Sequence, residues 1–492
     1  MVDASPESIQ HLIENSEKAL AQIEVSLPLI LETRQAVAET IKNHDGNNVV
    51  LDLTLVVLDT QLAENEVRYD LSASLNALLR AKDDYTKRYY MQSLNLCFWE
   101  ACQLFVGEDG DENGLLSRLV ALTKQINQAG CQYIAQHIID DVQAFRDRFA
   151  DRELRNITRH YDDPIKMYEK QRGLNNIDIF AKGVGELMAI CMELNVVSSF
   201  LLKLLVPSQM KTRNLVTSSK GGFDMKGMFN DVVFKAFKEK NLESEVQRVL
   251  DMGQKSLDEC YRRYGACCKG VELLREKGCQ EPEVFDKIKS LIRMRMETLF
   301  LRHDIACSVW GYLKASSDQE RSQILRLIHI TKQAALTHIY GYNEKAREKS
   351  LWMAINSIEG ANDGKMDLYS VKKSLDRLTG NLTDDKVNSQ MFAHYRYKEN
   401  YFIPVRLEAF GKMVHLKELM DALRLLRICK TLDDYMLSLL SYMDSKQRQE
   451  KQKQYNEWKG KIDGLVAKTG NDKRVIEVLK PMRKLIDIVF GD

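Results

Sequence analysis

The sequence has little proline and almost no net charge. Only 7 of its 492 residues are prolines, so helices can continue with few breaks. Leucine, alanine, glutamate and lysine, which favour helices, are abundant. A formal net charge of +1 provides no overall field that attracts nucleic acid or a membrane. The composition therefore predicts an all-α chain, and an anionic partner would have to be bound by a local positive patch.

The sequence also lacks the usual signatures of metal binding, cofactor binding and secretion. Its 10 cysteines form no CxxC pair, and no Walker loop, GxSxG, HExxH or dinucleotide-binding fingerprint is present. The first residues lack the basic start and apolar run of a signal peptide. The apolar run from Val49 to Leu58 is too short to span a bilayer. We therefore expect a cytoplasmic protein with reduced thiols, no cofactor, no bound metal and no membrane partner.

Helical periodicity and turn residues divide the first part of the chain into long helices. The pattern predicts helices over about residues 49–82, 85–106, 115–160 with a break near Gly130, and 177–205. Thr217 to Gly222 is the best linker in the sequence, because serine and glycine favour flexible connections. We therefore predict a first helical domain over residues 1–206 and a linker over residues 207–240.

Beyond this linker the sequence repeats itself at an interval of about 234 residues. Asp70 to Gly107 aligns without a gap over Asp304 to Gly341, with identities at 7 of 38 positions. His160-Tyr161 falls on His394-Tyr395 at the same interval. Shared leucine periodicity could produce one such match, but five matches in order favour a duplication. The other three pair Ile9–Leu20 with Val246–Leu257, Glu186–Met188 with Glu418–Met420, and Ser198–Leu205 with Asp433–Leu440.

The repeat predicts two tandem helical bundles, each with additional N-terminal helices. The second domain covers residues 241–441, and a helical tail covers residues 442–492. The tail begins with the charged stretch Asp444 to Gln454, which is typical of a solvated helix.

The most concentrated set of chemically capable side chains lies between Asp151 and Pro164. On a continuous helix over residues 145–160, Asn156 and His160 lie beside a stripe of four arginines. A guanidinium group binds phosphate oxygens through paired hydrogen bonds, and an imidazole exchanges a proton near neutral pH. The stripe consists of Arg148, Arg152, Arg155 and Arg159.

The same residues also fit the ordinary end of an amphipathic helix. Asp151 and Glu153 partly balance the arginines, and a cationic His160 would suit a helix C-terminus. Asp70 and its repeat partner Asp304 could be buried carboxylates that contact this helix, but we expect both at the polar surface.

The run Arg155-Asn156-Ile-Thr-Arg-His160 resembles the R-x4-6-H motif of HEPN domains (higher eukaryotes and prokaryotes nucleotide-binding), in its Arg-Asn-x-x-x-His form. The resemblance covers about residues 50–205 and, through the repeat, 285–440. It implies a small α-bundle that brings two motifs into one cleft. Many members of the family are metal-independent endoribonucleases of toxin–antitoxin, abortive-infection and CRISPR-linked phage-defence systems.

The resemblance also implies roles for individual residues. Arg155 would bind the scissile phosphate, His160 would take part in proton transfer, and Asn156 would be the polar residue that follows the arginine. Around them, Arg152, Arg159 and Tyr161 are expected to contact RNA.

The second copy of the motif departs from the family pattern. Ser389 and Gln390 stand where Arg155 and Asn156 stand in the first copy. His394 and Tyr395 remain, and Arg396 could restore some charge to the second site. We expect these three residues to bind substrate in a pseudo-dimer within the chain. A homodimer that pairs two first-copy motifs is the other arrangement.

Two functions from different classes fit the sequence. The first is a HEPN-like effector of a bacterial defence or stress system that cleaves or binds RNA without metal. The second is a non-catalytic helical scaffold that binds a protein partner, such as an antitoxin or a subunit of a defence complex. The incomplete second motif, the small net charge and the charged tail favour the scaffold.

Overall fold

The structure is a computed structural model of the whole chain. It describes residues 27–43, 48–107, 114–126, 129–161, 163–205, 242–276, 283–341, 350–356, 368–378 and 415–468, with the single residues 14, 18 and 348. These residues form helices and short connections, and no strand occurs in the described ranges. The predicted all-α helical fold is confirmed.

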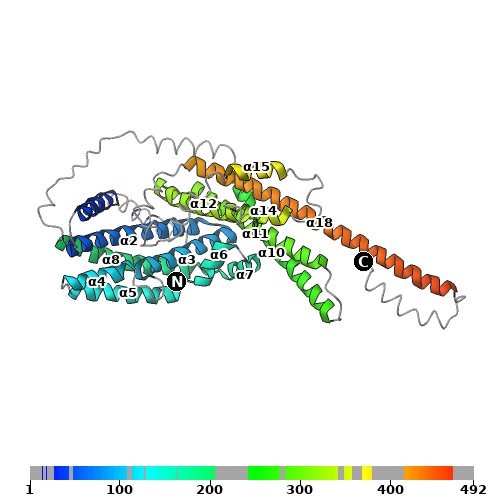
Figure 1. The fold of residues 1–492 in the computed structure, drawn as a ribbon, viewed down its shortest axis with the longest axis horizontal. Helices are drawn as coiled ribbons and strands as arrows, with labels where there is room; N and C mark the ends of the chain where they lie inside the picture. The colour runs from blue at the N-terminus through cyan, green and yellow to red at the C-terminus, as the bar shows by residue number, and fades with distance from the viewer. Residues whose placement is uncertain are drawn as a thin grey trace. The chain divides into compact units, whose positions relative to one another are not determined.

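The helices are numbered as in Figure 1, and a further helix covers residues 27–42. They are α2 (Val49–Arg80), α3 (Asp84–Val106), α4 (Leu115–Gln125), α5 (Ala129–Phe149), α6 (Arg152–His160), α7 (Pro164–Gly173), α8 (Ile177–Leu205), α10 (Leu242–Glu276), α11 (Glu283–Lys314), α12 (Asp318–Ile339), α14 (Leu351–Asn356), α15 (Leu368–Leu378) and α18 (His415–Lys468).

The chain divides into two compact units. The first contains residues 1–262 and 296–430, and the second contains residues 263–295 and 431–492. The first unit therefore combines residues of both predicted bundles. A duplicated chain can pack its two copies into one unit, so this division does not decide where the copies begin. The linker predicted over residues 207–240 lies outside the described residues and stays a prediction.

Helix α2 is the centre of the first unit. It packs against α3, α4 and α8, and its residues are buried on almost every side from Leu53 to Val67. This burial includes carboxylates, which require partners away from water. Asp59 accepts a hydrogen bond from Arg34 at 2.6 Å, and Glu64 accepts one from Asn195 of α8.

The described helices repeat at the interval found in the sequence. Adding 234 to the bounds of α2 gives the bounds of α11, and adding 234 to the start of α3 gives the start of α12. The caps repeat as well, because Asp83 and Ser317 accept the N–H groups of Thr86 and Glu320 at 2.8 and 3.2 Å. Both hairpins end at a glycine with positive φ, 84° at Gly107 and 78° at Gly341. Only glycine adopts this conformation readily.

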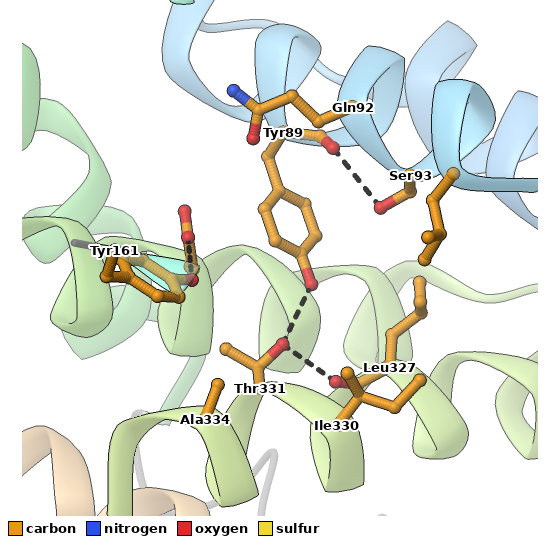
Figure 2. Close-up of a pocket in the computed structure, with 10 residues that line it drawn as sticks. Tyr89, Gln92, Ser93, Tyr161, Leu327, Ile330, Thr331 and Ala334 are labelled. Carbon is orange, nitrogen blue, oxygen red and sulfur yellow. Dashed lines mark hydrogen bonds between the residues drawn. The ribbon is translucent and has the colours of Figure 1, made fainter. Parts of the chain in front are cut away.

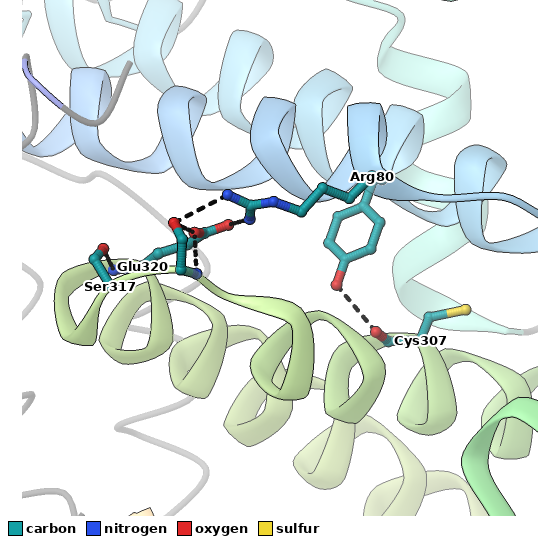
Figure 3. A network of polar contacts seen from close by, with 6 residues as sticks. Arg80, Cys307, Ser317 and Glu320 are labelled. Atoms are coloured by element: carbon teal, nitrogen blue, oxygen red, sulfur yellow. Dashed lines mark hydrogen bonds and ion pairs between the residues drawn. The ribbon is translucent and has the colours of Figure 1, made fainter. Parts of the chain in front are cut away.

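Contacts between α2 or α3 and α11 or α12 hold these two hairpins together inside the first unit. Figure 3 shows Arg80, which pairs with Glu320 and donates to Ser316 Oγ at 3.0 Å. The hydroxyl of Tyr90 donates to the carbonyl oxygen of Cys307 at 3.0 Å. A side chain at Gly311 would overlap this hydroxyl, so glycine is required there.

The second unit has a smaller core of its own. Within it, Arg295 pairs with Asp433 at 2.7 Å, and both side chains are almost buried. Close to Arg295 in the sequence, the side chains of Leu291 and Ile292 are buried. Close to Asp433, the side chain of Met436 is buried. In the predicted tail, the side chain of Ile462 is also buried.

Candidate functional site

The motif lies on its own short helix, α6. Asp151 caps this helix by accepting the N–H of Leu154 at 2.9 Å. The side chain of Asn95, on α3, holds the same residue by donating to the carbonyl of Asp151 at 2.9 Å and accepting its N–H at 2.8 Å. The start of α6 is thus fixed to α3 by hydrogen bonds to backbone groups.

The continuous helix expected over residues 145–160 is wrong. Helix α5 ends at Phe149 and α6 begins at Arg152, because Asp151 caps a new helix. Arg148 therefore belongs to α5, where it pairs with Glu186 of α8 at 2.8 Å. The predicted stripe is reduced to the three arginines of α6.

Arg155 forms an ion pair with a buried carboxylate of α3. Its Nε and Nη2 donate to Oε1 of Glu100 at 3.2 and 2.9 Å. The Glu100 side chain is 2% exposed and that of Arg155 is 17% exposed. Nη1 donates to Oδ1 of Asn156 at 2.9 Å. The guanidinium group is therefore fixed in orientation, and a carboxylate balances its charge.

The remaining motif residues lie along α6. Asn156 contacts Arg155 through its side-chain oxygen, and Arg152 is exposed with its guanidinium carbon 5.8 Å from the ring centroid of Trp99. Arg159 and His160 belong to α6, but their side chains lie outside the described part of the structure. The five residues predicted at the second site also lie outside it, namely Ser389, Gln390, His394, Tyr395 and Arg396.

The residue that follows His160 has an unusual backbone. Tyr161 adopts the left-handed conformation at φ 50° and is the one non-glycine residue with positive φ in the described ranges. Such a conformation costs about 1 kcal/mol or more in a bulky residue, so surrounding contacts must stabilise it. The ring of Tyr161 is buried and meets the ring of His338 edge-on at 5.4 Å.

The hydroxyl of Tyr161 donates to Asp304, a residue of α11. The other oxygen of this carboxylate accepts the hydroxyl of Tyr85 at 2.9 Å. Burial raises the pKa of Asp304 to about 7, although the hydrogen bonds from Tyr161 and Tyr85 act in the opposite direction. The second repeat thus supplies the group that fixes the end of the motif helix.

The expected surface positions of the two repeat-related aspartates are wrong. Asp70 and Asp304 are both buried, and Asp70 pairs with Arg326 of α12. The sequence showed that the two aspartates are separated by the repeat interval. Their burial could not be predicted, because it depends on cationic and hydroxyl partners from other helices. The weaker alternative, a buried carboxylate that contacts the motif segment, holds for Asp304.

A small cavity lined by both polar and apolar side chains lies next to Tyr161 and Asp304, where α3 and α12 meet (Figure 2). The hydroxyl of Tyr89 contacts that of Thr331 across it at 3.2 Å. With a volume of about 50 Å³, it can hold a few water molecules and is too small for a nucleotide. Its lining includes two repeat-related pairs, Ser93 with Leu327 and Leu96 with Ile330. The cavity therefore lies between equivalent positions of the two repeats.

Glu100 follows Leu96 by one helical turn, so the Arg155–Glu100 ion pair lies on the same side of α3 as the cavity. In the second repeat the equivalent positions hold Ala334 and Ser389. The second repeat therefore has neither the glutamate nor the arginine of this ion pair. Losing only one member would have left a charge without its balance.

The described residues contain no group of three or more His, Cys, Asp or Glu side chains placed to hold a metal ion. Among the described helices, α8 is long and apolar enough to cross a membrane by length and composition. The sequence interpretation overlooked this stretch, because the apolar residues of α8 are interrupted by polar ones.

Comparison with known proteins adds no relative. No protein-family model, curated protein or solved structure matches the chain. The partners that sequence reasoning missed, Glu100 and Asp304, are 55 and 143 residues away from the residues they hold. No local pattern could have identified them, although the repeat singled out Asp304.

Proposed function

We propose that this chain is a HEPN-like RNA-binding effector of a bacterial defence or stress system, with Arg155, Asn156 and His160 at its RNA site. The observation that carries the proposal is the fixed geometry of α6. Asn95 fixes the start of the helix, Glu100 orients Arg155, and Asp304 holds the residue after His160. Sites that bind and react with a substrate need this kind of fixed support.

In this proposal Arg155 keeps its contact with Glu100 and binds a phosphate oxygen from its remaining face. Arg152 and Arg159 add positive charge along the same helix. His160 either takes the proton of the ribose 2′-hydroxyl or gives one to the leaving 5′-oxygen, and a water molecule carries out the other proton transfer. The 2′-oxygen then attacks the phosphorus as the bond to the 5′-oxygen breaks, which leaves a cyclic phosphate and a protonated 5′-hydroxyl. Because phosphate binding and proton transfer are assigned to side chains, the proposed reaction requires no metal ion.

The test is cleavage of a labelled single-stranded RNA by the purified full chain in the presence of EDTA. Arg155→Ala and His160→Ala should each abolish cleavage, and Arg155→Ala should also weaken RNA binding. Arg172→Ala is the matched control, because Arg172 is half exposed on α7 and lies outside the motif. Equal cleavage by all four proteins would refute the catalytic role.

Glu100 allows a sharper test of Arg155. Glu100→Gln keeps a hydrogen-bond acceptor beside the guanidinium and removes the balancing negative charge. If Arg155 binds phosphate, this variant should bind RNA several-fold more tightly at low salt, and the difference should shrink as salt rises. An unchanged or lower affinity with intact folding would count against a phosphate contact.

The same ion pair favours a second function, a non-catalytic helical scaffold for a protein partner such as an antitoxin. A guanidinium balanced by a buried carboxylate is also what a purely structural arginine looks like. For a scaffold, Arg155→Ala should destabilise the fold without changing RNA affinity. A protein partner that co-purifies at high salt, with no bound nucleic acid, would support this function. The cytoplasmic location stays a prediction in both cases.

A further inference from the structure

Helix α8 has two apolar faces, and the fold buries only one of them. The first face packs against α2 and α5. The other face carries Met192, Val196, Phe200 and Leu204, which are 54%, 69%, 53% and 52% exposed. Their spacing of four residues places them in one stripe, which runs for about 18 Å along the helix. The buried face includes Val184, Leu187, Cys191, Leu194 and Leu201.

A stripe of four large apolar side chains differs from the isolated apolar residues found on any surface. Contiguous apolar patches on soluble proteins usually mark a site of interaction. The stripe is also almost uncharged. Between Ala189 and Leu204, the exposed charged residues of α8 are Glu193 and Lys203. Neither forms an ion pair with another described residue.

The residues of the stripe are complementary to those of a second copy of α8 that runs antiparallel to the first. If two copies of α8 lie antiparallel and cross midway between Val196 and Phe200, residue numbers that face each other add up to 396. Met192 then meets Leu204 of the second copy, and Val196 meets Phe200. Glu193 meets Lys203, so each of the two charges finds its opposite twice in the symmetric pair. A two-fold dimer requires this kind of self-complementary surface.

We propose that the outer face of α8 is a homodimer interface, formed by two copies of this chain with their α8 helices antiparallel. The four apolar residues form its centre, and the two Glu193–Lys203 pairs set its direction and register. The inference stands apart from the proposed RNA site, because it uses no residue of α6.

In the second repeat, part of the equivalent helix face is buried by other residues of the same chain. The buried positions of α8 recur in α18 at an interval of 235, so Phe200 and Leu204 correspond to Tyr435 and Leu439. Tyr435 and Leu439 are each only 7% exposed, within the second unit. Met192 and Val196 correspond to the polar residues Arg427 and Thr431. The first repeat is therefore the copy whose apolar face is left uncovered.

A lipid surface fits the stripe less well than a second copy. Helices that lie on a membrane carry lysine and arginine along the borders of the apolar face. Here the exposed charges are one acid and one base, so they give no attraction to anionic lipid. Crossing the bilayer would require α8 to leave the bundle and expose the partners of its buried face.

The experiment is sedimentation equilibrium of the full chain over a range of concentrations, with circular dichroism to verify that each variant is folded. The wild type should behave as a reversible dimer. Phe200→Glu should raise the dimer dissociation constant by about 30-fold or more, because apolar aromatic residues at interface centres contribute most of the affinity. Ala189→Glu, at the edge of the stripe and outside the predicted pairs, is the matched control and should change the dissociation constant little.

Charge exchange tests the antiparallel register. Glu193→Lys should weaken the dimer about tenfold, because both copies then place lysine against lysine. Lys203→Glu should weaken it similarly by placing glutamate against glutamate. The double variant Glu193→Lys/Lys203→Glu restores opposite charges and should return the dissociation constant close to the wild-type value.

Four outcomes would overturn the proposal. They are a monomer at every accessible concentration, a dimer that Phe200→Glu leaves intact, a double charge variant no tighter than the two single ones, and a monomer that sediments with phosphatidylserine vesicles in a Phe200-dependent manner. The last outcome would assign the stripe to a lipid surface.

Discussion

The first and second repeats fill the same position with opposite chemistry. In the first repeat, Phe98 of α3 packs against the rings of Phe145 and Phe180, at centroid distances of 5.3 and 6.3 Å. In the second, the equivalent residue of α12 is Lys332, which is 2% exposed. Lys332 donates to Glu418 at 2.7 Å, and Glu418 also contacts His329 at 3.1 Å. The same position of the repeat thus belongs to an aromatic cluster in the first repeat and to an ion cluster in the second.

The residues that face this position differ in the complementary way. Gly183 of α8 lies against Phe98, and a Cβ there would come within 2.9 Å of the ring. At the interval of 235, Gly183 corresponds to Glu418. A large ring with a glycine, and a lysine with a glutamate, are two ways to fill a similar space. The comparison teaches that the helical frame tolerates an exchange of core chemistry, since the cap positions and the helix starts are kept at the interval of 234.

The largest effect is expected from breaking the ion cluster. Lys332→Met should lower the free energy of unfolding by about 3–5 kcal/mol, because it removes the lysine that pairs with the buried Glu418 at 2.7 Å. Asp421 keeps its ion pair with Arg424 at 3.1 Å. Adding Glu418→Gln should recover part of this loss, since the uncompensated charge is removed. Urea unfolding of both proteins measures the difference. An equal loss in the single and double variants would mean that packing, and not charge, is what Lys332 provides.

The pH dependence of stability should separate Asp304 from the ion cluster. The folded pKa of Asp304 is raised from 3.8 to about 7, so the folded state binds a proton that the unfolded state releases. Stability from this group is present at low pH and declines as pH rises from about 4 to about 7, by up to a few kcal/mol. Asp304→Asn should remove that decline.

Unfolding of wild type and Asp304→Asn at several pH values tests this expectation. Glu64, whose pKa burial raises to about 8, contributes with the same sign in both proteins, so the difference between them reports Asp304. Glu418 acts in the opposite direction. Burial raises its pKa, but His329 and Lys332 outweigh burial and lower it to about 2. Its contribution is therefore lost as pH falls from about 4.5 towards 2. Parallel pH profiles for the two proteins would contradict the assignment to Asp304.

A smaller effect is expected from adding a methyl group on α8. Gly183→Ala should destabilise by about 1–3 kcal/mol, because Phe98 and Phe149 leave no room for the new atom. Gly185→Ala is the matched control on the same helix, since nothing lies within 4 Å of its added Cβ. Alanine favours helices, so the control should gain up to about 1 kcal/mol. Thermal unfolding that ranks the two variants in the reverse order would contradict this packing.

The smallest change is the removal of one hydroxyl. Tyr161→Phe keeps the buried ring and deletes the hydrogen bond to Asp304, with an expected loss of about 1–2 kcal/mol. Tyr85→Phe deletes the other bond to the same carboxylate and serves as its counterpart on α3. If RNA binding is measured as well, Tyr161→Phe should weaken it more than Tyr85→Phe does, because only Tyr161 adjoins the motif. Equal effects on RNA would leave Tyr161 with a purely structural role.

Much of the helical frame could be predicted from the sequence. Periodicity predicted a helix over residues 177–205, where α8 lies, and the interval of 234 reappears in the bounds of α11 and in the start of α12. The break before α6 was not predicted, because Asp151 can act as a cap or continue a helix, and its contact with Asn95 decides between them. The partners of Arg155 and Tyr161 come from distant helices. Sequence patterns indicate which faces are buried but not which polar groups meet there.

The left-handed Tyr161 has a practical consequence for how the chain can be divided. A fragment that stops before residue 207 would contain every residue of the first motif. It would lack Asp304 and His338, which hold Tyr161 in a conformation that its own backbone disfavours. The end of α6 would then lose the two contacts that stabilise the left-handed backbone of Tyr161. The repeat that has Ser389 at the position of Arg155 would in this way still support the end of the helix that carries Arg155.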